Sequence, residues 1–122
     1  LPLLVGRSRA IEIVLGADDY DAGTAERYGW INRAIADAEL DDFVANFVRR
    51  VLSFDQQALS TAKKIINQRG LPDPAQLQAT EDIFFTTYQW PGATERMPKL
   101  RERGIGTPGE FELNLGRHIE NL

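Results

Sequence analysis

Apolar residues recur along most of the chain at the spacing of a helix face. The clearest stripe lies in residues 37–52, where apolar positions alternate at intervals of three and one. Its members are Leu40, Phe43, Val44, Phe47, Val48, Val51 and Leu52. The pattern predicts an amphipathic helix that is capped by Asp37 and ends near Arg49 and Arg50, as the helix dipole favours. Because such a stripe needs a partner surface, we expect this helix to be the hub of the domain.

Residues 1–15 are apolar around most of a helix and not along one stripe. Leu4, Ile11 and Val14 lie close to one line, while other apolar residues spread around the remaining circumference. A helix of this kind belongs in the core of something larger, and a natural protein rarely opens on one. We therefore expect residue 1 to be an internal cut, and the helix to stop at Gly16.

The remaining elements are predicted from their start and stop signals. Asp21 can cap a short helix that ends before Gly29, and Asp55 can cap one that ends at Gly70. Asp73–Pro74 begins the next helix, which residues 90–92 close.

Two further helices are expected near the C-terminus, and one extended piece before them. Thr94 is expected to cap a helix that ends at Gly104, and a start near Pro91 would predict a kink at Pro98. Residues 107–110 read as a capping box that begins a terminal helix, whose apolar face would reach Leu122. Residues 30–35 read as a short extended segment, so the expected fold is mainly α, with at most one short strand.

Composition narrows the function classes. A chain of 122 residues with 43% apolar and 26% charged residues suits one soluble domain. Its net charge is −4 and its basic residues are scattered, which argues against a nucleic-acid interface. The absence of cysteine excludes disulfides and thiol nucleophiles and fits a cytoplasmic origin. No apolar run approaches the ~18 residues of a membrane span, so no membrane partner is expected.

Side chains that could carry chemistry are few. His118 is the single histidine and therefore the obvious candidate for a general base, but we favour a surface or helix-end position for it. One histidine and no cysteine leave only carboxylates as metal ligands. The acidic pairs at residues 18–19 and 41–42 are expected to be solvated, so no metal site is predicted.

Two features near the N-terminus admit a functional interpretation. Glu12 lies within an apolar helix, where burial would suit it to acid/base chemistry, although an ion pair with Arg7 or Arg9 is favoured. Residues 6–9 have a glycine and two arginines but lack the glycine spacing and the Lys-Ser/Thr pair of a phosphate loop.

Two blocks of sequence carry a family likeness. From Leu1 to Leu15 the chain reads Leu-Pro-x-Leu-Val-Gly-x-x-Arg-Ala-x-Glu-x-Val-Leu. From Asp21 to Arg33 it reads Asp-Ala-x-x-Ala-x-x-x-Gly-x-Ile-Asn-Arg. In this order and spacing the blocks resemble the crotonase superfamily, the enoyl-CoA hydratase/isomerase-like proteins. The likeness spans the chain loosely and is specific up to about Ala34.

The resemblance implies that residues 1–122 are a single helical region, the multi-helix C-terminal part of a crotonase-like (ClpP/crotonase) fold. In that family the oxyanion hole and the two acid/base glutamates come from a sheet-bearing N-terminal part and have no counterpart here. No catalytic residue is therefore assigned, and the chain alone is expected to be inactive. The resemblance also implies a homo-oligomer, a trimer or hexamer in the family, and a coenzyme A thioester as substrate of the parent enzyme, with no separate cofactor.

Three residues fall where the family contacts coenzyme A. Phe84 stands where an aromatic ring meets the adenine. The family's last common helix commonly reads Glu-Gly-x-x-Ala-Phe-x-Glu-Lys-Arg, and the corresponding stretch here runs from Glu95 to Gly104. In it Leu100 replaces the phenylalanine, and Arg103 replaces a lysine that approaches a phosphate, a role that arginine can serve. The alternative places Phe84 and Leu100 in the core and Arg103 in solvent.

Two functions from different classes remain. The first is the C-terminal portion of an acyl-CoA enzyme, a lyase or isomerase of fatty acid metabolism, which covers the coenzyme A pocket and forms oligomer contacts. Its reaction could be hydration, isomerisation, dehalogenation or thioester hydrolysis. The second is a stand-alone helical module for protein–protein interaction or oligomerisation, because exposed apolar faces mark such surfaces.

Overall fold

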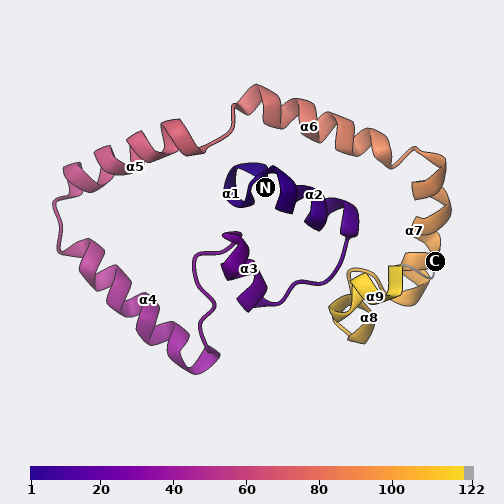
Figure 1. Ribbon diagram of the computed structural model, residues 1–122, viewed down its shortest axis with the longest axis horizontal. Coiled ribbons are helices and arrows are strands. Elements are labelled where there is room, and N and C mark those ends of the chain that lie inside the picture. The colour runs from indigo at the N-terminus through magenta and orange to yellow at the C-terminus, as the bar shows by residue number, and fades with distance from the viewer. Residues whose placement is uncertain (120–122) are drawn as a thin grey trace. The chain divides into compact units, whose positions relative to one another are not determined.

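A computed structural model describes residues 1–119 as a succession of α-helices (Figure 1). They are α1 (Pro2–Val5), α2 (Arg7–Gly16), α3 (Ala22–Tyr28), α4 (Asp37–Leu52), α5 (Gln56–Gly70), α6 (Pro74–Thr87), α7 (Pro91–Arg103), α8 (Glu110–Leu113) and α9 (Leu115–Ile119). The mainly α prediction is confirmed. No strand occurs among the described residues, so residues 30–35 form no part of a sheet; the amides of Trp30 and Ile31 donate to the carbonyl of Ala25 instead.

The chain divides into two compact units. One joins Leu1–Asp21 to Pro72–Leu122 and contains α1, α2 and α6 to α9, and the other is Ala22–Leu71, with α3 to α5. Each unit is described by itself below.

The predicted first helix is two helices. Gly6 separates α1 from α2 with a φ of +81°, a conformation that glycine adopts without steric cost. The predicted stop is confirmed, because α2 ends at Gly16, where Ala17 takes a left-handed conformation and donates to the carbonyl of Ile13. Of this segment, Val5, Ala10 and Ile13 are buried. The other large apolar side chains of the segment are exposed.

The first unit continues through α6 to α7. Asp73 caps α6 as predicted, because its carboxylate accepts a hydrogen bond from the Ala75 amide at 2.7 Å. The predicted start of the next helix was wrong, because α7 begins at Pro91 and not after Thr94. Trp90 is extended and Pro91 takes the first helical position, where its missing N–H leaves no bond unmade. Pro98 consequently lies inside the helix.

A tight turn follows α7. Gly104 ends the helix with a φ of +101°, and the amides of Gly104 and Ile105 donate to the carbonyls of Arg101 and Leu100. This pair of bonds forms a Schellman motif, and the predicted end of the helix at Gly104 is confirmed.

The predicted single terminal helix is interrupted. Gly109 and not Thr107 precedes α8, no side chain caps it, and Asn114 separates α8 from α9. Leu122, which the prediction placed on the apolar face of this helix, lies outside the described residues.

The second unit is formed by α3 to α5. The predicted end of α3 before Gly29 is confirmed, and Gly29 has a φ of +77°. Asp55 caps α5 as predicted, through a 2.8 Å bond from the Ala58 amide. The cap of α4 was misplaced by one residue, because Ala36 holds the cap position and Asp37 is already helical.

The prediction that α4 is a hub was wrong for this unit. No residue of α4 or α5 is buried, and Ala25 of α3 is the buried apolar residue of the unit. Phe47, near the centre of the α4 stripe, is 61% exposed. A hub needs a second apolar surface against its stripe, and neither neighbouring helix of the unit supplies one.

Candidate functional site

The aromatic candidate Phe84 projects from α6 into an exposed cluster of rings. It is 54% exposed and meets Tyr88 and Phe85 edge-on, with ring centroids 5.3 Å and 5.9 Å away. Phe85 is the next residue of α6, and Tyr88 is the residue that caps the end of this helix, so the end of α6 presents the cluster. An exposed ring face of this kind can receive a planar group or a partner's apolar surface.

The other two candidates lie one turn apart at the end of α7. Leu100 is 6% exposed and is the buried residue of that helix, whereas Arg103 is exposed in the last turn. Leu100 therefore anchors the end of α7 in its unit. The structure brings Leu100 and Arg103 together on one helix, while the described ring contacts of Phe84 are to α6 and its C-cap residue.

The guanidinium of Arg103 lies over an aromatic ring. Its Cζ atom is 5.0 Å from the centroid of Phe111 in α8, within the range of a cation–π contact. The ring of Phe111 in turn stacks on the imidazole of His118, with centroids 5.0 Å apart and planes inclined by 26°. Sequence reasoning missed Phe111, which shares no pattern with Arg103 and meets it only through the turn between α7 and α8.

His118 lies near the end of α9, and its side chain is 29% exposed. Its Nε2 atom is buried and makes no hydrogen bond, although it lies 3.4 Å from a carboxylate oxygen of Glu110. That separation allows an ion pair when the imidazole is protonated, but its geometry is too poor for a hydrogen bond. His118 is thus a stacking residue near a helix end, without a nucleophile among its described partners.

The acidic residues do not converge. Within residues 1–119 no group of three or more His, Asp or Glu side chains is placed to hold a metal ion. Glu12 is exposed on α2, so it lacks the burial that the acid/base interpretation required. Burial, with the charges of Glu12 and Asp18, raises the pKa of the Tyr20 hydroxyl above its ordinary value of 10.0.

One of the acidic pairs has a structural role that the sequence did not indicate. Asp18 and Asp19 are exposed, as expected, but the carboxylate of Asp19 accepts a 3.0 Å hydrogen bond from the amide of Gly116 in α9. This bond joins the segment after α2 to the C-terminal helix of the same unit.

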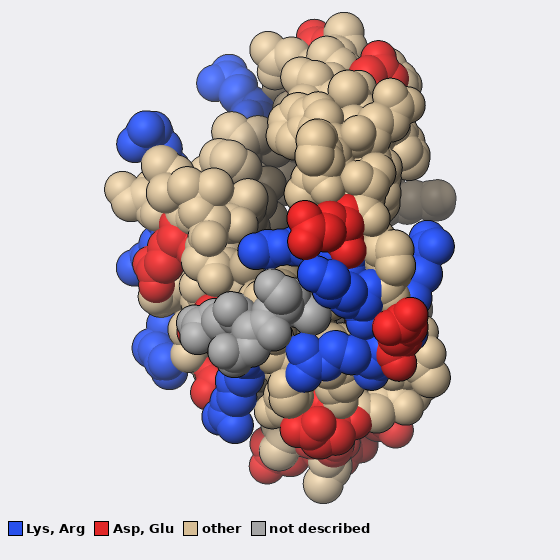
Figure 2. Space-filling view, turned by 90° about the vertical axis from the view of Figure 1, so that its right-hand side faces the viewer, with Lys and Arg blue, Asp and Glu red and all other residues tan. Residues whose placement is uncertain are grey.

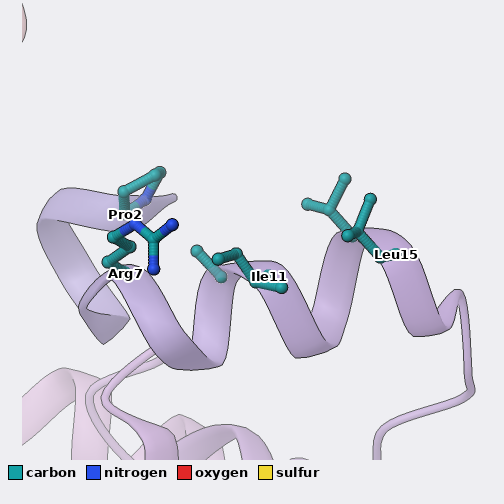
Figure 3. Close-up of a pocket in the computed structure, with 6 residues that line it drawn as sticks. Pro2, Arg7, Ile11 and Leu15 are labelled. Atoms are coloured by element: carbon teal, nitrogen blue, oxygen red, sulfur yellow. The ribbon is translucent and has the colours of Figure 1, made fainter.

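An open apolar groove of about 400 Å³ runs along α1 and α2. In Figure 3, Arg7 lies beside Pro2 at one end, and Ile11 and Leu15 follow along α2. Ala10 and Val14 complete the lining. Arg7 is its one charged member, so the groove suits an apolar partner. The all-round apolar character of residues 1–15 predicted burial in a larger core and did not indicate an open groove.

Helix α7 carries more basic than acidic residues, whereas the chain as a whole carries more acidic ones. The helix carries four basic residues, Arg96, Lys99, Arg101 and Arg103, against two acidic ones, Glu95 and Glu102. Lys99 and Glu95 form an exposed ion pair at 3.3 Å, a contact that contributes little to stability. Figure 2 shows Lys and Arg side chains gathered on one part of the face in view, with acidic side chains beside them.

The relatives found by comparison with known proteins all carry the name enoyl-CoA hydratase. The crystal structure of a "putative enoyl-CoA hydratase" from Streptomyces avermitilis superposes with a TM-score of 0.93 and 43% identity, over 99% of this chain and 44% of that one. "Probable enoyl-CoA hydratase EchA12" of Mycobacterium tuberculosis is 35% identical over 79 residues, which are 65% of this chain and 27% of the relative. The protein of that name from Mycobacterium bovis matches equally.

The chain thus spans less than half the length of the relatives that it matches. No protein-family model matches it. Within the described part of the chain, no helix is both long enough and apolar enough to cross a membrane.

Proposed function

Because the chain belongs to the crotonase superfamily, as the helical C-terminal portion of an enoyl-CoA hydratase-like protein, we propose that its helices cover a coenzyme A pocket and form contacts between subunits. The substrate class that we propose for the parent enzyme is an acyl-CoA thioester. A separate cofactor and a metal have no part in the proposal.

The proposal rests on three consecutive helices whose large apolar side chains are exposed. No described residue of α4, α5 or α6 is buried, although each carries large apolar side chains. Examples are Phe43, Ile66 and Phe85, which are 41%, 67% and 58% exposed. Large apolar patches of this kind on a folded chain mark surfaces that bind a ligand or another protein surface.

Two exposed groups suit the ends of coenzyme A. The ring of Phe84 is flat, apolar and accessible, and it can stack on a purine. The guanidinium of Arg103 presents a planar fork of N–H donors, which matches the geometry of two phosphate oxygens. Leu100, buried beneath the end of α7, supports that helix and is assigned no direct part in coenzyme A recognition.

Calorimetric titration with coenzyme A tests this assignment. We expect Phe84→Leu and Arg103→Gln each to weaken binding, because one removes the stacking face and the other the charged donors. Phe54→Leu serves as the matched control for the first variant, since it removes a ring that is 53% exposed and lies outside the Phe84 cluster. Equal affinities of the original chain and of both site variants would refute the coenzyme A contacts.

The chain alone is expected to have no hydratase activity, because no residue of it matches the amides or glutamates of the family's reaction centre. A spectrophotometric assay of crotonyl-CoA hydration by the purified 122-residue chain measures this directly. Turnover that follows the chain through a second purification step would contradict the expectation.

The second candidate function is an interaction module that binds itself or another protein without coenzyme A. The same exposed faces favour it, so ligand binding must separate the two. Light scattering at micromolar concentration should show self-association under both proposals. A monodisperse monomer would count against the subunit contacts, whereas association without coenzyme A binding would favour the module.

A further inference from the structure

Arg103 ends α7 with its charge against an aromatic face. The distance of 5.0 Å from its Cζ atom to the Phe111 centroid is shorter than the 5.8 Å of Arg33 over Phe43 and the 6.0 Å of Arg50 over Phe54. Within residues 1–119, no ion pair and no side-chain hydrogen bond engages the Arg103 guanidinium. Its charge therefore lies against a ring, and no carboxylate of residues 1–119 pairs with it.

The turn after α7 creates this contact. Gly104 and Gly106 both have positive φ angles, of +101° and +76°, which fold the chain back from the end of the helix. The amide of Gly106 donates a 2.7 Å hydrogen bond to the carboxylate of Glu112, in the second half of α8. This bond ties the turn to α8 and keeps Phe111 beside the last residue of α7.

A second contact holds the Phe111 ring from α9. The stacked imidazole of His118, 5.0 Å away, restricts the ring, and Glu110 lies 3.4 Å from the same imidazole. The ring that carries the guanidinium is thus itself fixed by the packing of α8 on α9, and Phe111 is only partly exposed.

We infer that Phe111 is a positioning residue for Arg103. Its ring contacts the face of the guanidinium and leaves the N–H groups at the edge of that group open to phosphate oxygens. The inference rests on the proposed coenzyme A function. A stacked guanidinium keeps its donors, because the π contact uses the face of the group and not its edge. A carboxylate in the same place would occupy the donors and cancel the charge. Holding the long side chain before binding also removes part of the entropic cost of ordering it on the ligand.

Binding of coenzyme A to five variants tests the inference, with pantetheine, its phosphate-free fragment, as the second probe. We expect Phe111→Leu to weaken coenzyme A binding about two- to fivefold, the size of a cation–π contact near solvent, and Phe111→Tyr to restore it. In an Arg103→Gln background, Phe111→Leu should cause no further loss. Pantetheine affinity should be unaffected throughout. Arg101→Gln is the matched control, because it removes the same charge from the other side of α7.

The outcomes separate the inference from the proposed function. If Arg103→Gln weakens coenzyme A binding and Phe111→Leu does not, the positioning role is refuted and the phosphate contact stands. If Arg103→Gln has no effect, both fall. An equal loss from Phe111→Leu with and without Arg103 would show a general structural effect and would also overturn the inference.

A measurement on the unsubstituted chain keeps the inference testable should Phe111→Leu fail to fold. Ring currents of Phe111 should shift the side-chain proton resonances of Arg103 upfield, and Phe111→Tyr should preserve that shift. Resonances of Arg103 at their ordinary positions in the folded chain would exclude the contact, and with it the positioning role.

Discussion

Replacing Gly116 with alanine should undock the C-terminal helix α9 from the segment after α2. A Cβ atom at residue 116 would lie 2.7 Å from the backbone nitrogen of Asp19 and 3.0 Å from two backbone atoms of Asp18. Those neighbours are main-chain atoms, which cannot rotate away as a side-chain tip can. Either α9 or residues 18–19 must shift, and the 3.0 Å bond from the Gly116 amide to the Asp19 carboxylate is lost with the movement.

The magnitude has two contributions. Overpacking against fixed neighbours costs about 1–3 kcal/mol. A hydrogen bond to a charged group contributes about 1.5–3 kcal/mol, and the lower end applies because this one is only partly buried. We expect Gly116→Ala to destabilise the contact by roughly 2.5–4.5 kcal/mol and Asp19→Ala by about 1.5 kcal/mol, since the second loses the bond without the overlap. The double variant should match Gly116→Ala alone, because both changes remove the same bond.

Amide hydrogen exchange at Gly116 and urea unfolding followed by circular dichroism measure these changes. Gly92→Ala is the matched control, because a Cβ there meets nothing within 4 Å. Its stability should be unchanged or slightly higher, since alanine restricts the unfolded chain. If Gly116→Ala behaves like Gly92→Ala, to within about 0.5 kcal/mol, then α9 is not docked on residues 18–19 and the reasoning is wrong.

Three further substitutions test other parts of the fold. Asp55→Ala should cost about 1 kcal/mol of α5 stability and increase amide exchange at Ala58, whereas Asp55→Asn should retain the cap; equal exchange in both variants would contradict this. Leu100→Ala should lower the stability of its unit by about 2–5 kcal/mol in thermal melting, and Leu100→Met by less than about 1.5, a difference that a solvated side chain would not produce. Tyr20→Phe should remove a loss of stability at alkaline pH. The raised pKa of Tyr20 leaves the folded form protonated longer than the unfolded form, so its contribution is present below pH 10.0 and is lost as pH rises through the folded value. Urea unfolding at about pH 9 and pH 11 would detect this, and an identical alkaline loss in both proteins would refute it.

Local signals predicted well where the controlling contact spans a few residues. Asp55 and Asp73 cap their helices through amides three and two residues away, so sequence order alone brings donor and acceptor together. Gly104 was predicted correctly for the same reason, because a Schellman motif needs only the preceding turn.

The predicted helix boundaries were wrong where two local signals compete. Thr94 and Pro91 can both begin a helix, and the extended conformation of Trp90 gives Pro91 the first position. Thr94 then donates its hydroxyl to the carbonyls of Trp90 and Pro91 within the helix. The break at Gly6 was missed because apolar periodicity continues across it and carries no information on the sign of φ.

Contacts between residues that are far apart in the chain could not be predicted from the sequence. The bond between Gly116 and Asp19 joins residues 97 positions apart, and no spacing in the sequence predicts it. The Arg103–Phe111 contact is closer in sequence, but it depends on two positive φ angles in the turn between them. The family likeness predicted a phosphate contact for Arg103, and it gave no indication of the ring that lies against this side chain.

The size of the open faces decides what kind of partner they need. Six large apolar side chains of α4 are 41–77% exposed, namely Leu40, Phe43, Val44, Phe47, Val48 and Leu52. Full burial of such a side chain contributes about 1.5–3 kcal/mol, so covering the exposed half of all six contributes roughly 5–9 kcal/mol. Association costs at least about 4 kcal/mol before any ordering of side chains, so the face of α4 alone would support only weak binding. A lasting cover of this face must therefore also engage another helix of the same unit, such as α5, where Ile65 and Ile66 are 54% and 67% exposed. A partner that contacts α4 alone would dissociate readily.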